Sequence, residues 1–379
     1  MLPFSAIIGQ EDAKLALLLA AIDPTIGGVL LAGDKGTGKS SIVRSFARIL
    51  PDIEVVAGCR YNCSPSLPDE MCDDCRRKYA SFDNRAPALQ KTPHIVNIPL
   101  GTTEDRLLGT VDMEKLLNTG EVHFAPGLLA EANRQILYID EVNLLPDNIT
   151  DDILDAAAGG VNTVEREGIS ISHPSKFLLV GTMNPEEGQL RPQILDRFAL
   201  SVKMRTINEP HLREEIVKRA IASAGAPRDF EKIFDKANDA LKQKITSARE
   251  RLQDVEIPMK HISAVSLAMS QLGVDGQRPD IVIVKSAIAC AALDNDKKVA
   301  EAHIEKVAPL AVCHRTRNGG MEQPPEQDKV KEALVEAFKV IKERKTETQT
   351  LRLNGIAQMV IQSAMSAIEQ ASEEIKKNE

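Results

Sequence analysis

Short apolar runs alternate with longer amphipathic stretches in the first half of the chain. The runs are rich in Val, Ile, Leu and Phe, which is typical of buried strands, and the stretches between them place apolar residues at helical spacing. The runs lie at 29–32, 94–98, 136–139, 177–181 and 200–204. Strands that alternate with helices form a parallel sheet with helices on both faces, so the pattern predicts an α/β fold for this half.

Two short segments interrupt this alternation. Residues 118–124 contain Asn-Thr-Gly followed by an apolar-polar alternation, which predicts a turn and a strand. Residues 161–172 alternate around a turn at 166–168, which predicts a β-hairpin. Thr102, three residues before Asp105, is typical of a helix-starting cap.

The second half of the chain is predicted to be helical, because strand signals nearly stop after residue 208. Amphipathic or apolar helices are predicted at 211–224, 229–252, 259–273, 280–293 and 328–344, with a Gly- and Pro-rich loop at 319–327 and a polar linker at 346–350. In the tail, Leu353, Ile356 and Ala364 share one helical face with Met359 or Val360. This face predicts either a helix docked on the helical domain or one that binds a partner or stabilises an oligomer.

The composition is that of a globular protein of two or three domains. The 379 residues are 43% hydrophobic and 27% charged, which excludes collagenous, disordered and disulfide-scaffold classes. The net charge of −8 argues against nucleic-acid binding as the main task. The apolar stretch at 15–22 is too short to span a bilayer and lacks a basic leader. We therefore expect no membrane contact and a cytoplasmic protein that begins near Met1; a plastid precursor would need an additional leader.

A phosphate-binding loop follows the first predicted strand. Its sequence fits GxxxxGK[ST] and consists of Gly33, Asp34, Lys35, Gly36, Thr37, Gly38, Lys39 and Ser40. The glycines allow backbone N–H groups and a helix N-terminus to face phosphate oxygens. Lys39 would reach the β and γ phosphates, and Ser40 would ligate Mg²⁺. The alternative is a Gly-rich surface turn, which the flanking strand and helix disfavour.

Polar groups suited to hydrolysis follow the later strands. Asp140 and Glu141 end the run at 136–139, where Asp140 can hold Mg²⁺ and Glu141 can polarise water, although acids also favour any helix N-terminus. Asn184 follows the next run and could fix the water or the γ phosphate, or could simply form a turn before a proline. Arg197 could stabilise the transferring phosphoryl group of a neighbouring subunit, or form a surface ion pair.

Longer strings around these residues resemble the AAA+ motor subunit of magnesium chelatase, over residues 3–345. The resemblance extends, more distantly, to cobalt chelatase motors and to the MoxR group of AAA+ proteins. The strings that carry it are Gly-Thr-Thr-Glu-Asp-Arg at 101–106, Tyr-Ile-Asp-Glu-Val-Asn-Leu-Leu at 138–145, Val-Glu-Arg-Glu-Gly at 164–168, Gly-Thr-Met-Asn-Pro-Glu-Glu-Gly at 181–188 and Leu-Asp-Arg-Phe at 195–198.

This resemblance implies roles for residues at matching positions. Lys39 and Ser40 correspond to the phosphate-loop pair, and Asp140 and Glu141 to the metal and water carboxylates. Asn184 corresponds to the first sensor, Arg197 to the arginine finger that acts on a neighbour, and Arg278 to the second sensor. Arg191 is the competing finger candidate. The implied domains are an AAA+ P-loop NTPase domain at 1–207 with a Cys-rich insert at 57–80 and a β-hairpin insert, an all-helical lid at 208–345, and a helical extension at 346–379.

The resemblance also implies an assembly and a function. The motor forms a homo-oligomeric ring, commonly hexameric, and hydrolyses ATP with Mg²⁺. It acts through an integrin-like AAA+ second subunit on a large porphyrin-binding subunit, where Mg²⁺ enters protoporphyrin IX in chlorophyll biosynthesis. The motor of a cobalt chelatase and a MoxR-type chaperone that remodels a protein complex are the alternatives. A nucleotide-dependent scaffold and a DNA motor are rivals that the hydrolytic set and the acidic charge, respectively, oppose.

Four of the six cysteines are clustered, which is unusual among the chelatase motors that the chain resembles. Cys59, Cys63, Cys72 and Cys75 form the pattern Cys-x3-Cys-x8-Cys-x2-Cys in a polar segment that cannot build a core. Four thiolates could close a structural zinc site, and an iron–sulfur cluster or redox-active or free thiols are the alternatives.

Overall fold

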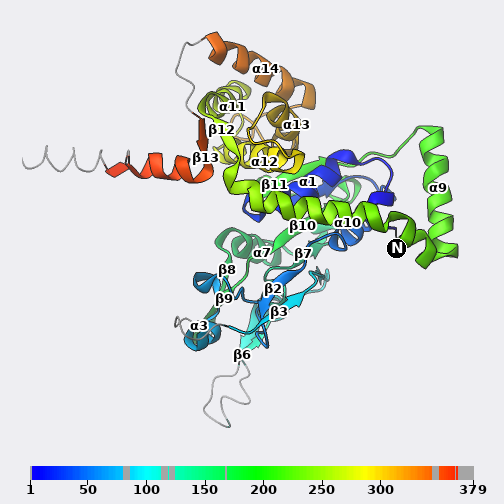
Figure 1. Cartoon of the computed structure of the whole chain (residues 1–379), viewed down its shortest axis with the longest axis vertical. Helices are drawn as coiled ribbons and strands as arrows, with labels where there is room; N and C mark the ends of the chain where they lie inside the picture. Colours follow the sequence, from blue (N-terminus) through cyan, green and yellow to red (C-terminus); the bar gives the residue numbers. More distant parts are fainter. Residues whose placement is uncertain are drawn as a thin grey trace, which may run out of the picture. The chain divides into compact units, whose positions relative to one another are not determined.

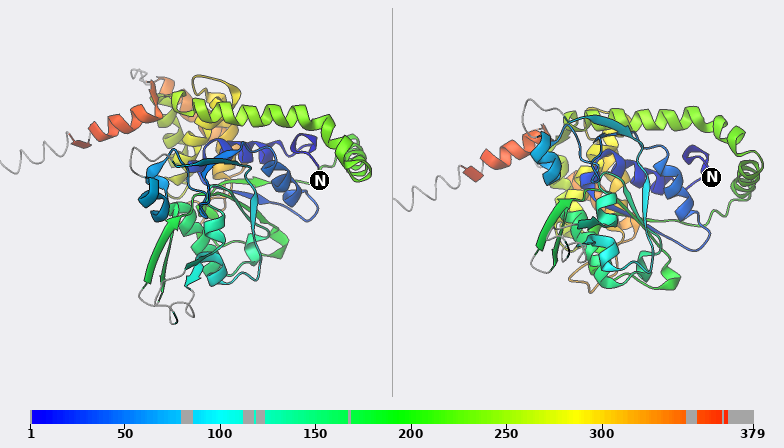
Figure 2. Two further views of the ribbon diagram at one scale, coloured as in Figure 1. Left: turned by 60° about the horizontal axis from the view of Figure 1, so that its bottom comes forward. Right: turned by 90° about the horizontal axis from the view of Figure 1, so that it is seen from below.

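The structure is a computed structural model in which the chain forms two compact units. It describes residues 2–79, 86–111, 118, 124–166, 169–343, 350–362 and 364–365. The first unit comprises residues 1–246 and the second residues 247–379, and their elements are labelled in Figure 1. The division lies inside the long helix α10 (Pro227–Arg251), so α9 (Pro210–Gly225) and most of α10 belong to the first unit. Figure 2 shows α10 as one unbroken helix.

A parallel sheet of five strands forms the centre of the first unit and confirms the predicted fold class. Its strands follow the order β11-β1-β10-β7-β4. Their bounds are β1 Gly28–Ala32, β4 Ile95–Ile98, β7 Ile136–Ile139, β10 Leu178–Met183 and β11 Phe198–Lys203, close to the five predicted runs. Because all five strands are parallel, their carboxyl ends meet at one edge, where ligands bind in open α/β sheets.

Helices pack on this sheet through apolar side chains. Helix α7 (Asp147–Gly159) buries Ile149 and Ile153 in a cluster that also contains Leu137 of β7 and Phe198 of β11. Helix α1 (Glu11–Ile22) is buried along nearly its whole length. The other helices of this unit are α2 Lys39–Ala47, α3 Asp73–Tyr79, α4 Glu104–Leu108, α6 Leu128–Glu131 and α8 Pro192–Arg197, with 3-10 turns η1 Phe4–Ala6, η2 Pro24–Ile26, η3 Pro68–Glu70, η4 Val142–Leu144 and η5 Pro185–Glu187.

The first unit also contains small antiparallel pairs of strands outside the five-stranded sheet. The predicted hairpin is confirmed as β8 (Val161–Arg166) paired with β9 (Ile169–Pro174). Strand β6 (Phe124–Pro126) pairs with β5 (Gly109–Val111), whereas the predicted strand residues 121–123 lie outside the described residues. A further pair, which the sequence did not predict, joins β2 (Ile53–Val56) to β3 (Ala88–Lys91).

The predicted start of α4 is wrong by one residue. Thr103 is the N-cap, and the hydroxyl of Thr102 donates instead to the carbonyl of Pro99 at 2.6 Å. Because the Thr102 hydroxyl serves the preceding loop, it is not available to the first turn of the helix.

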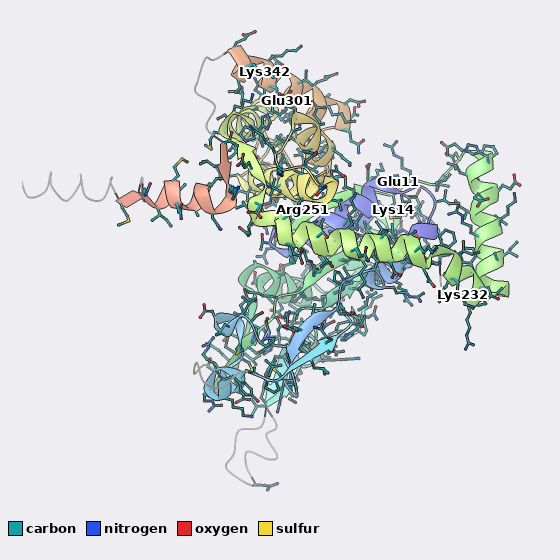
Figure 3. All side chains as sticks on the ribbon, in the orientation of Figure 1. Glu11, Lys14, Lys232, Arg251, Glu301 and Lys342 are labelled. Carbon is teal, nitrogen blue, oxygen red and sulfur yellow. The ribbon has the colours of Figure 1, made fainter. Side chains whose placement is uncertain are left out.

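The second unit is a helical bundle with one short strand pair. Its helices are α11 Met259–Leu272, α12 Arg278–Asp294, α13 Glu301–Val312 and α14 Gln327–Glu343, and the turn η6 (Leu252–Asp254) and the pair β12 (Glu256–Pro258) with β13 (Thr350–Arg352) complete it. Glu301 of α13 and Lys342 of α14, both labelled in Figure 3, form an ion pair at 2.9 Å. Residues 353–362 are helical, and Leu353, Ile356 and Met359 on the predicted apolar face are only half-buried.

Candidate functional site

The phosphate loop connects β1 to α2 at the carboxyl edge of the sheet. Gly36 and Gly38 have φ of +80° and +87°, which only glycine adopts without strain, and the space around each is open. At Gly33 a Cβ atom would come within 2.5 Å of the carbonyl oxygen of Met204, so a side chain has no room there. The loop backbone therefore borders open space at Gly36 and Gly38, where we expect phosphates to bind.

Lys39 is the buried cation of this loop. Its side chain is only 9% exposed, and its ammonium donates to the carbonyl oxygens of Gly33 and Asp34, the latter at 2.8 Å. Both acceptors belong to the loop itself, so the ammonium already lies in the concavity where phosphates bind.

Asp140 is held by hydroxyl groups from three strands or loops. Ser40 Oγ lies 3.3 Å from Asp140 Oδ1, which joins the phosphate loop to the end of β7. The hydroxyls of Thr182 and Tyr138 donate to the same oxygen at 2.6 and 2.8 Å. Burial raises the pKa of Tyr138 to about 12, so its phenol remains a donor at neutral pH. No sequence motif assigns a role to Tyr138 or Thr182, although their positions, two residues before Asp140 and Asn184 on adjacent strands, were the available signal.

Glu141 has an unusual backbone conformation. Its φ of +57° places a non-glycine residue in the left-handed region, and its N–H donates to the hydroxyl of Thr182 at 3.0 Å. Such conformations are costly and cluster at functional sites. The left-handed turn directs Glu141 away from the line of β7, so the two neighbouring carboxylates point in different directions.

Asn184 lies buried at the end of β10. It is 1% exposed, its Oδ1 accepts from the N–H of Glu186 at 3.2 Å, and its Nδ2 has no hydrogen-bond partner among the described residues. A buried amide donor without a partner is costly, so this position favours a group that can accept a hydrogen bond from Nδ2.

A salt bridge crosses from the phosphate loop to the segment after Asn184. Lys35 Nζ lies 2.5 Å from Glu187 Oε1. The hydrogen bond between them raises the pKa of Lys35 and lowers the pKa of Glu187. The sequence assigned Lys35 to the loop without identifying this partner in the turn η5 after β10.

The two finger candidates lie at opposite ends of α8. Arg197 pairs with Asp155 at 2.5 Å, and Arg191 pairs with Asp147 at 2.7 Å, so each guanidinium contacts a carboxylate of α7. Both arginines are partly exposed, and exposed ion pairs are weak enough to exchange partners. Arg278 is exposed and is the first residue of α12 in the second unit.

A cavity of about 380 Å³ opens beside the phosphate loop, and the sequence analysis did not foresee it. Its wall combines Gly36 to Gly38 with residues of three distant segments. These segments contribute Ile7, Ile8, Gln10, Met204, Ile207, Arg213, Ile216 and Val217. An apolar slot adjoining a phosphate loop suits a nucleobase. The available signal in the sequence was the Ile-Ile-Gly-Gln string at 7–10. It precedes the first helix and belongs to no predicted strand.

Gly9 and Gln10 shape this cavity. A Cβ on Gly9 would meet Ile207 Cδ1 at 2.8 Å, and the side-chain amide of Gln10 donates to the carbonyl of Arg205 at 2.8 Å. The N-terminal segment is thereby fastened to the chain that leaves β11.

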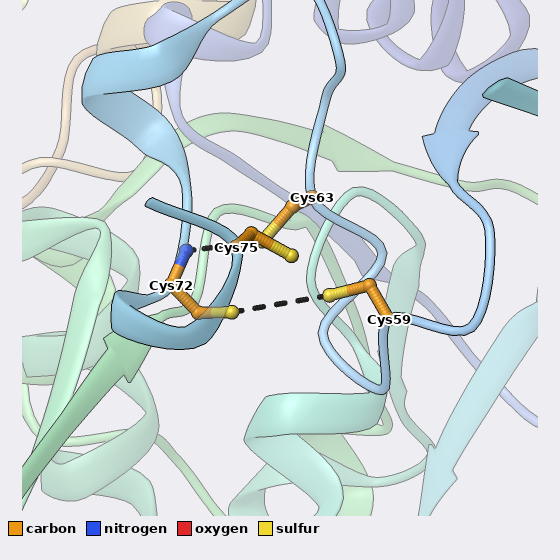
Figure 4. A group of neighbouring side chains, drawn as sticks. All are labelled: Cys59, Cys63, Cys72 and Cys75. Atoms are coloured by element: carbon orange, nitrogen blue, oxygen red, sulfur yellow. Dashed lines mark hydrogen bonds between the residues drawn. The ribbon is translucent and has the colours of Figure 1, made fainter. Parts of the chain in front are cut away.

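The four clustered cysteines converge away from this site. Cys63, Cys72 and Cys75 are buried and Cys59 is half-buried, and all four Sγ atoms lie within 4.8 Å of one another (Figure 4). The grouping predicted from the spacing is therefore present in the fold.

None of the helices in the described part of the chain is long and apolar enough to cross a membrane.

Comparisons with known families identify three matching regions. The profile described as "Magnesium chelatase, subunit ChlI" matches residues 3–82, that of the AAA domain (dynein-related subfamily) matches residues 82–198, and that of the AAA lid domain matches residues 263–337.

Several curated proteins are similar along most of the chain. Magnesium-chelatase subunit ChlI of Mesostigma viride is 46% identical over 341 residues, covering 90% of this chain and 94% of that protein. The ChlI subunit of Synechocystis is 47% identical over 343 residues, covering 90% and 95%. A ChlI homolog of Methanocaldococcus jannaschii is 47% identical over 338 residues, covering 89% and 91%.

Two solved structures are also similar. One is a BchI–BchD complex of magnesium chelatase based on a cryo-EM reconstruction, with 42% identity, coverage of 88% and 99%, and a TM-score of 0.49. The other, a crystal structure from Cytophaga hutchinsonii described as an ATPase, has 16% identity, coverage of 91% and 92%, and a TM-score of 0.54, and it supports the fold alone.

Proposed function

This chain belongs to the family of magnesium-chelatase ChlI subunits, and on that premise we propose that it is the ATP-hydrolysing AAA+ motor of a magnesium chelatase. Its hydrolysis drives insertion of Mg²⁺ into protoporphyrin IX on a partner subunit. The observation that carries this proposal is the 46% identity over 90% of the chain, which extends far beyond the short ATPase motifs. Stripping a strongly hydrated cation before insertion gives the energy input a chemical reason.

The residues at the sheet edge fit ATP and Mg²⁺. The open space around Gly36 and Gly38 accommodates phosphates, and the unpartnered Nδ2 of Asn184 offers a donor to them. Ser40 and Asp140 would hold the Mg²⁺, which supplies charge neutralisation on the phosphates. Lys39 binds the β and γ phosphates, and Glu141 polarises the attacking water.

The ring and its shared sites are part of this proposal. Arg197, supported by its exposed position on α8, would leave Asp155 and reach the nucleotide of the neighbouring copy. Arg278 at the start of α12 would sense the nucleotide from the helical domain. Hydrolysis would then depend on assembly, because each copy lacks the cation that its neighbour supplies.

We assign two further subunits as partners and the cytoplasm as the compartment. An integrin-like AAA+ subunit would transmit the motion, and a large subunit would bind the porphyrin, so this chain need not touch the tetrapyrrole. The Mg²⁺ of the nucleotide belongs to this function. The metal that we assign to the four cysteines, Zn²⁺, has a separate role.

Reconstitution tests the proposal. The purified chain is mixed with the two partner subunits, ATP, Mg²⁺ and protoporphyrin IX, and formation of the magnesium porphyrin is followed by fluorescence. Product that depends on this chain and on ATP supports the proposal. Steady ATP turnover without metal insertion would contradict it and favour a MoxR-type motor, and insertion of Co²⁺ in place of Mg²⁺ would favour a cobalt chelatase.

A further inference from the structure

The four clustered cysteines lie on one short insert, residues 57–79, which we name the cysteine insert. Cys59 and Cys63 lie on the loop after β2, Cys72 precedes α3, and Cys75 lies in its first turn. We propose that these four residues bind one Zn²⁺ ion as thiolates, and that the ion fastens the cysteine insert to the base of the β8–β9 hairpin. The four thiols release their protons to solvent when the ion binds.

The spacing of the sulfur atoms fits a single ion. Zn–S bonds of about 2.3 Å in a tetrahedron place the sulfurs roughly 3.8 Å apart. The Sγ atoms of Cys59 and Cys72 are 3.9 Å apart, and all four lie within 4.8 Å of one another. An iron–sulfur cluster, whose irons are bridged by sulfide, would hold its thiolates further apart. A disulfide needs about 2.05 Å between its sulfur atoms, and none of the four clustered cysteines forms one.

Backbone amides already point at the sulfurs. The N–H of Cys72 donates to Cys63 Sγ at 3.1 Å, and the N–H of Tyr61 donates to Cys59 Sγ at 3.4 Å. Such bonds stabilise thiolates and orient them as ligands. Figure 4 shows the four side chains directed toward one another, with the Cys72 bond drawn.

The charge and access of the site also suit a metal. A cavity of about 150 Å³ adjoins the cluster and includes Cys59, Cys72 and Cys75 in its wall. Arg60 and Lys78 line the same cavity together with Asp74, so the wall carries an excess of positive charge that partly offsets the net negative charge of Zn²⁺ with four thiolates. The cavity gives the ion a path of entry next to the half-buried Cys59.

The cysteine insert has little other core. Its buried cluster consists of Cys63, Cys72 and Cys75 with Val56, Tyr61, Met71 and Ala130. Small segments that cannot bury enough apolar surface are usually stabilised by a metal or by disulfides. Here the cysteines themselves are a large part of the interior, so the ion replaces apolar packing.

The insert contacts the hairpin base at two points. Tyr61, between the first two cysteines, stacks on His173 of β9 with ring centroids 5.0 Å apart and planes inclined by 20°. Glu70 pairs with Lys176, two residues after β9, at 2.9 Å.

The insert also contacts the segment that enters β7. Asn133 Nδ2 donates to the carbonyl of Tyr61 at 2.5 Å, and Asn62 Nδ2 donates to the carbonyl of Asn133 at 3.2 Å. Fixing residues 59–63 on a metal would therefore also fix the residues that contact the hairpin base and the segment leading into β7.

Metal analysis of the purified full chain tests the site. Elemental analysis and native mass spectrometry should find one zinc per chain. Replacement by Co²⁺ should give the visible bands of a tetrahedral thiolate complex. Iron with inorganic sulfide would overturn the proposal. So would a chain prepared under reducing conditions that binds neither Zn²⁺ nor Co²⁺.

A matched pair of variants separates this cluster from the other thiols. Cys75→Ser should lower the bound zinc to well below one equivalent, whereas Cys313→Ser, in the second unit, should leave it unchanged. If Cys75→Ser does not fold, Cys59→Ser at the half-buried position serves instead, with increased release of zinc to a chelating dye as its readout. Full zinc retention in both cluster variants would contradict the assignment.

Hydrogen exchange tests the fastening role. Removing zinc with a chelator should increase exchange in residues 170–176 and 133–135, while strand β1 at 28–32 should keep its protection. Unchanged exchange at the hairpin base, in protein shown to have lost its zinc, would overturn the fastening role. These readouts do not involve ATP or porphyrin, so they stand apart from the chelatase assay.

Discussion

The nucleotide site and the cysteine insert hold their ligands in opposite ways. At the nucleotide site, Ser40 and Asp140 meet across 100 residues of sequence because their strands run in parallel to one edge. In the cysteine insert, all four ligands come from residues 59–75, and the local chain has almost no apolar core. The sheet therefore organises the first site before any ion binds, whereas the zinc that we propose would supply the cysteine insert with order that its small apolar core does not.

This difference predicts that substitutions at the two sites affect different properties of the protein. Changes at the nucleotide site should alter chemistry and leave folding intact, because the sheet persists without those side chains. Changes at the cysteine insert should alter local order first. Four experiments can break or sharpen this comparison.

The largest effect is expected for the arginine finger. Arg197→Ala should reduce ATP turnover of the assembled protein roughly 10³-fold, because the transferring phosphoryl group loses its neighbouring cation, while nucleotide affinity is kept. Steady-state turnover and binding of a fluorescent nucleotide measure the two quantities. Arg191→Ala is the matched control at the other end of α8 and should retain turnover. The reverse result would move the finger to Arg191.

A loss of roughly 10²-fold in turnover is expected for Glu141→Gln, because the amide cannot polarise water. The left-handed backbone at this position is retained, so ATP binding and the thermal midpoint should change little. Glu186→Gln, an exposed carboxylate two residues after Asn184, is the control and should stay near the unchanged rate. Full activity of Glu141→Gln would remove Glu141 from the mechanism.

A smaller effect is expected when the support of Asp140 is removed. Thr182→Val deletes the 2.6 Å hydrogen bond to Asp140 and keeps the side-chain volume. Loss of a group that orients a metal ligand should raise the Mg²⁺ concentration needed for half-maximal ATP turnover about 10-fold. Thr163→Val, on an exposed face of β8, is the control. An unchanged Mg²⁺ requirement would show that Asp140 needs no such support.

The smallest effect is expected when the pH is lowered, because the change acts on His173 at the base of the β8–β9 hairpin. Burial lowers the pKa of His173 below its ordinary value of 6.5, so the ring is neutral in the folded protein. The buried neutral ring contributes fully to the free energy of unfolding above pH 6.5. Between pH 6.5 and the lowered pKa of the folded state, only the unfolded chain takes up the proton, so this contribution is lost as the pH falls through that interval.

Hydrogen exchange at residues 170–176, corrected for intrinsic rates, should therefore rise several-fold between about pH 7 and about pH 5. Strand β1 should not respond. His173→Gln removes the titration and should flatten this dependence. An equal acid response in the variant would assign it to another group.

The sequence predicted those parts of the site that consist of contiguous strings. The phosphate loop, Asp140 with Glu141, Asn184 and the sheet strands were found because each is a local pattern next to an apolar run. The cysteine grouping was likewise visible from spacing alone. The chemical roles of all these residues remain predictions, and those of Arg197, Arg191 and Arg278 also concern a neighbouring copy or the other unit.

Other features required the three-dimensional contacts. The cavity beside the phosphate loop combines residues 7–10 with residues 204–217, and neither segment has a chemical motif of its own. Helix α13 was missed because Pro309 lies inside it and argues locally against a helix, although burial on several sides stabilises it. The β2–β3 pair was missed because β3 is short and largely exposed, so no apolar run marks it.

The hydroxyl of Thr182 gives the sheet a mechanical property. It donates to Asp140 and accepts from the N–H of Glu141, so one oxygen on β10 spans both carboxylate-bearing residues at the end of β7. A sliding of β10 against β7 would therefore displace Asp140 and Glu141 together. With the roles that we propose for these two carboxylates, shear between the two strands would change the rate of ATP hydrolysis.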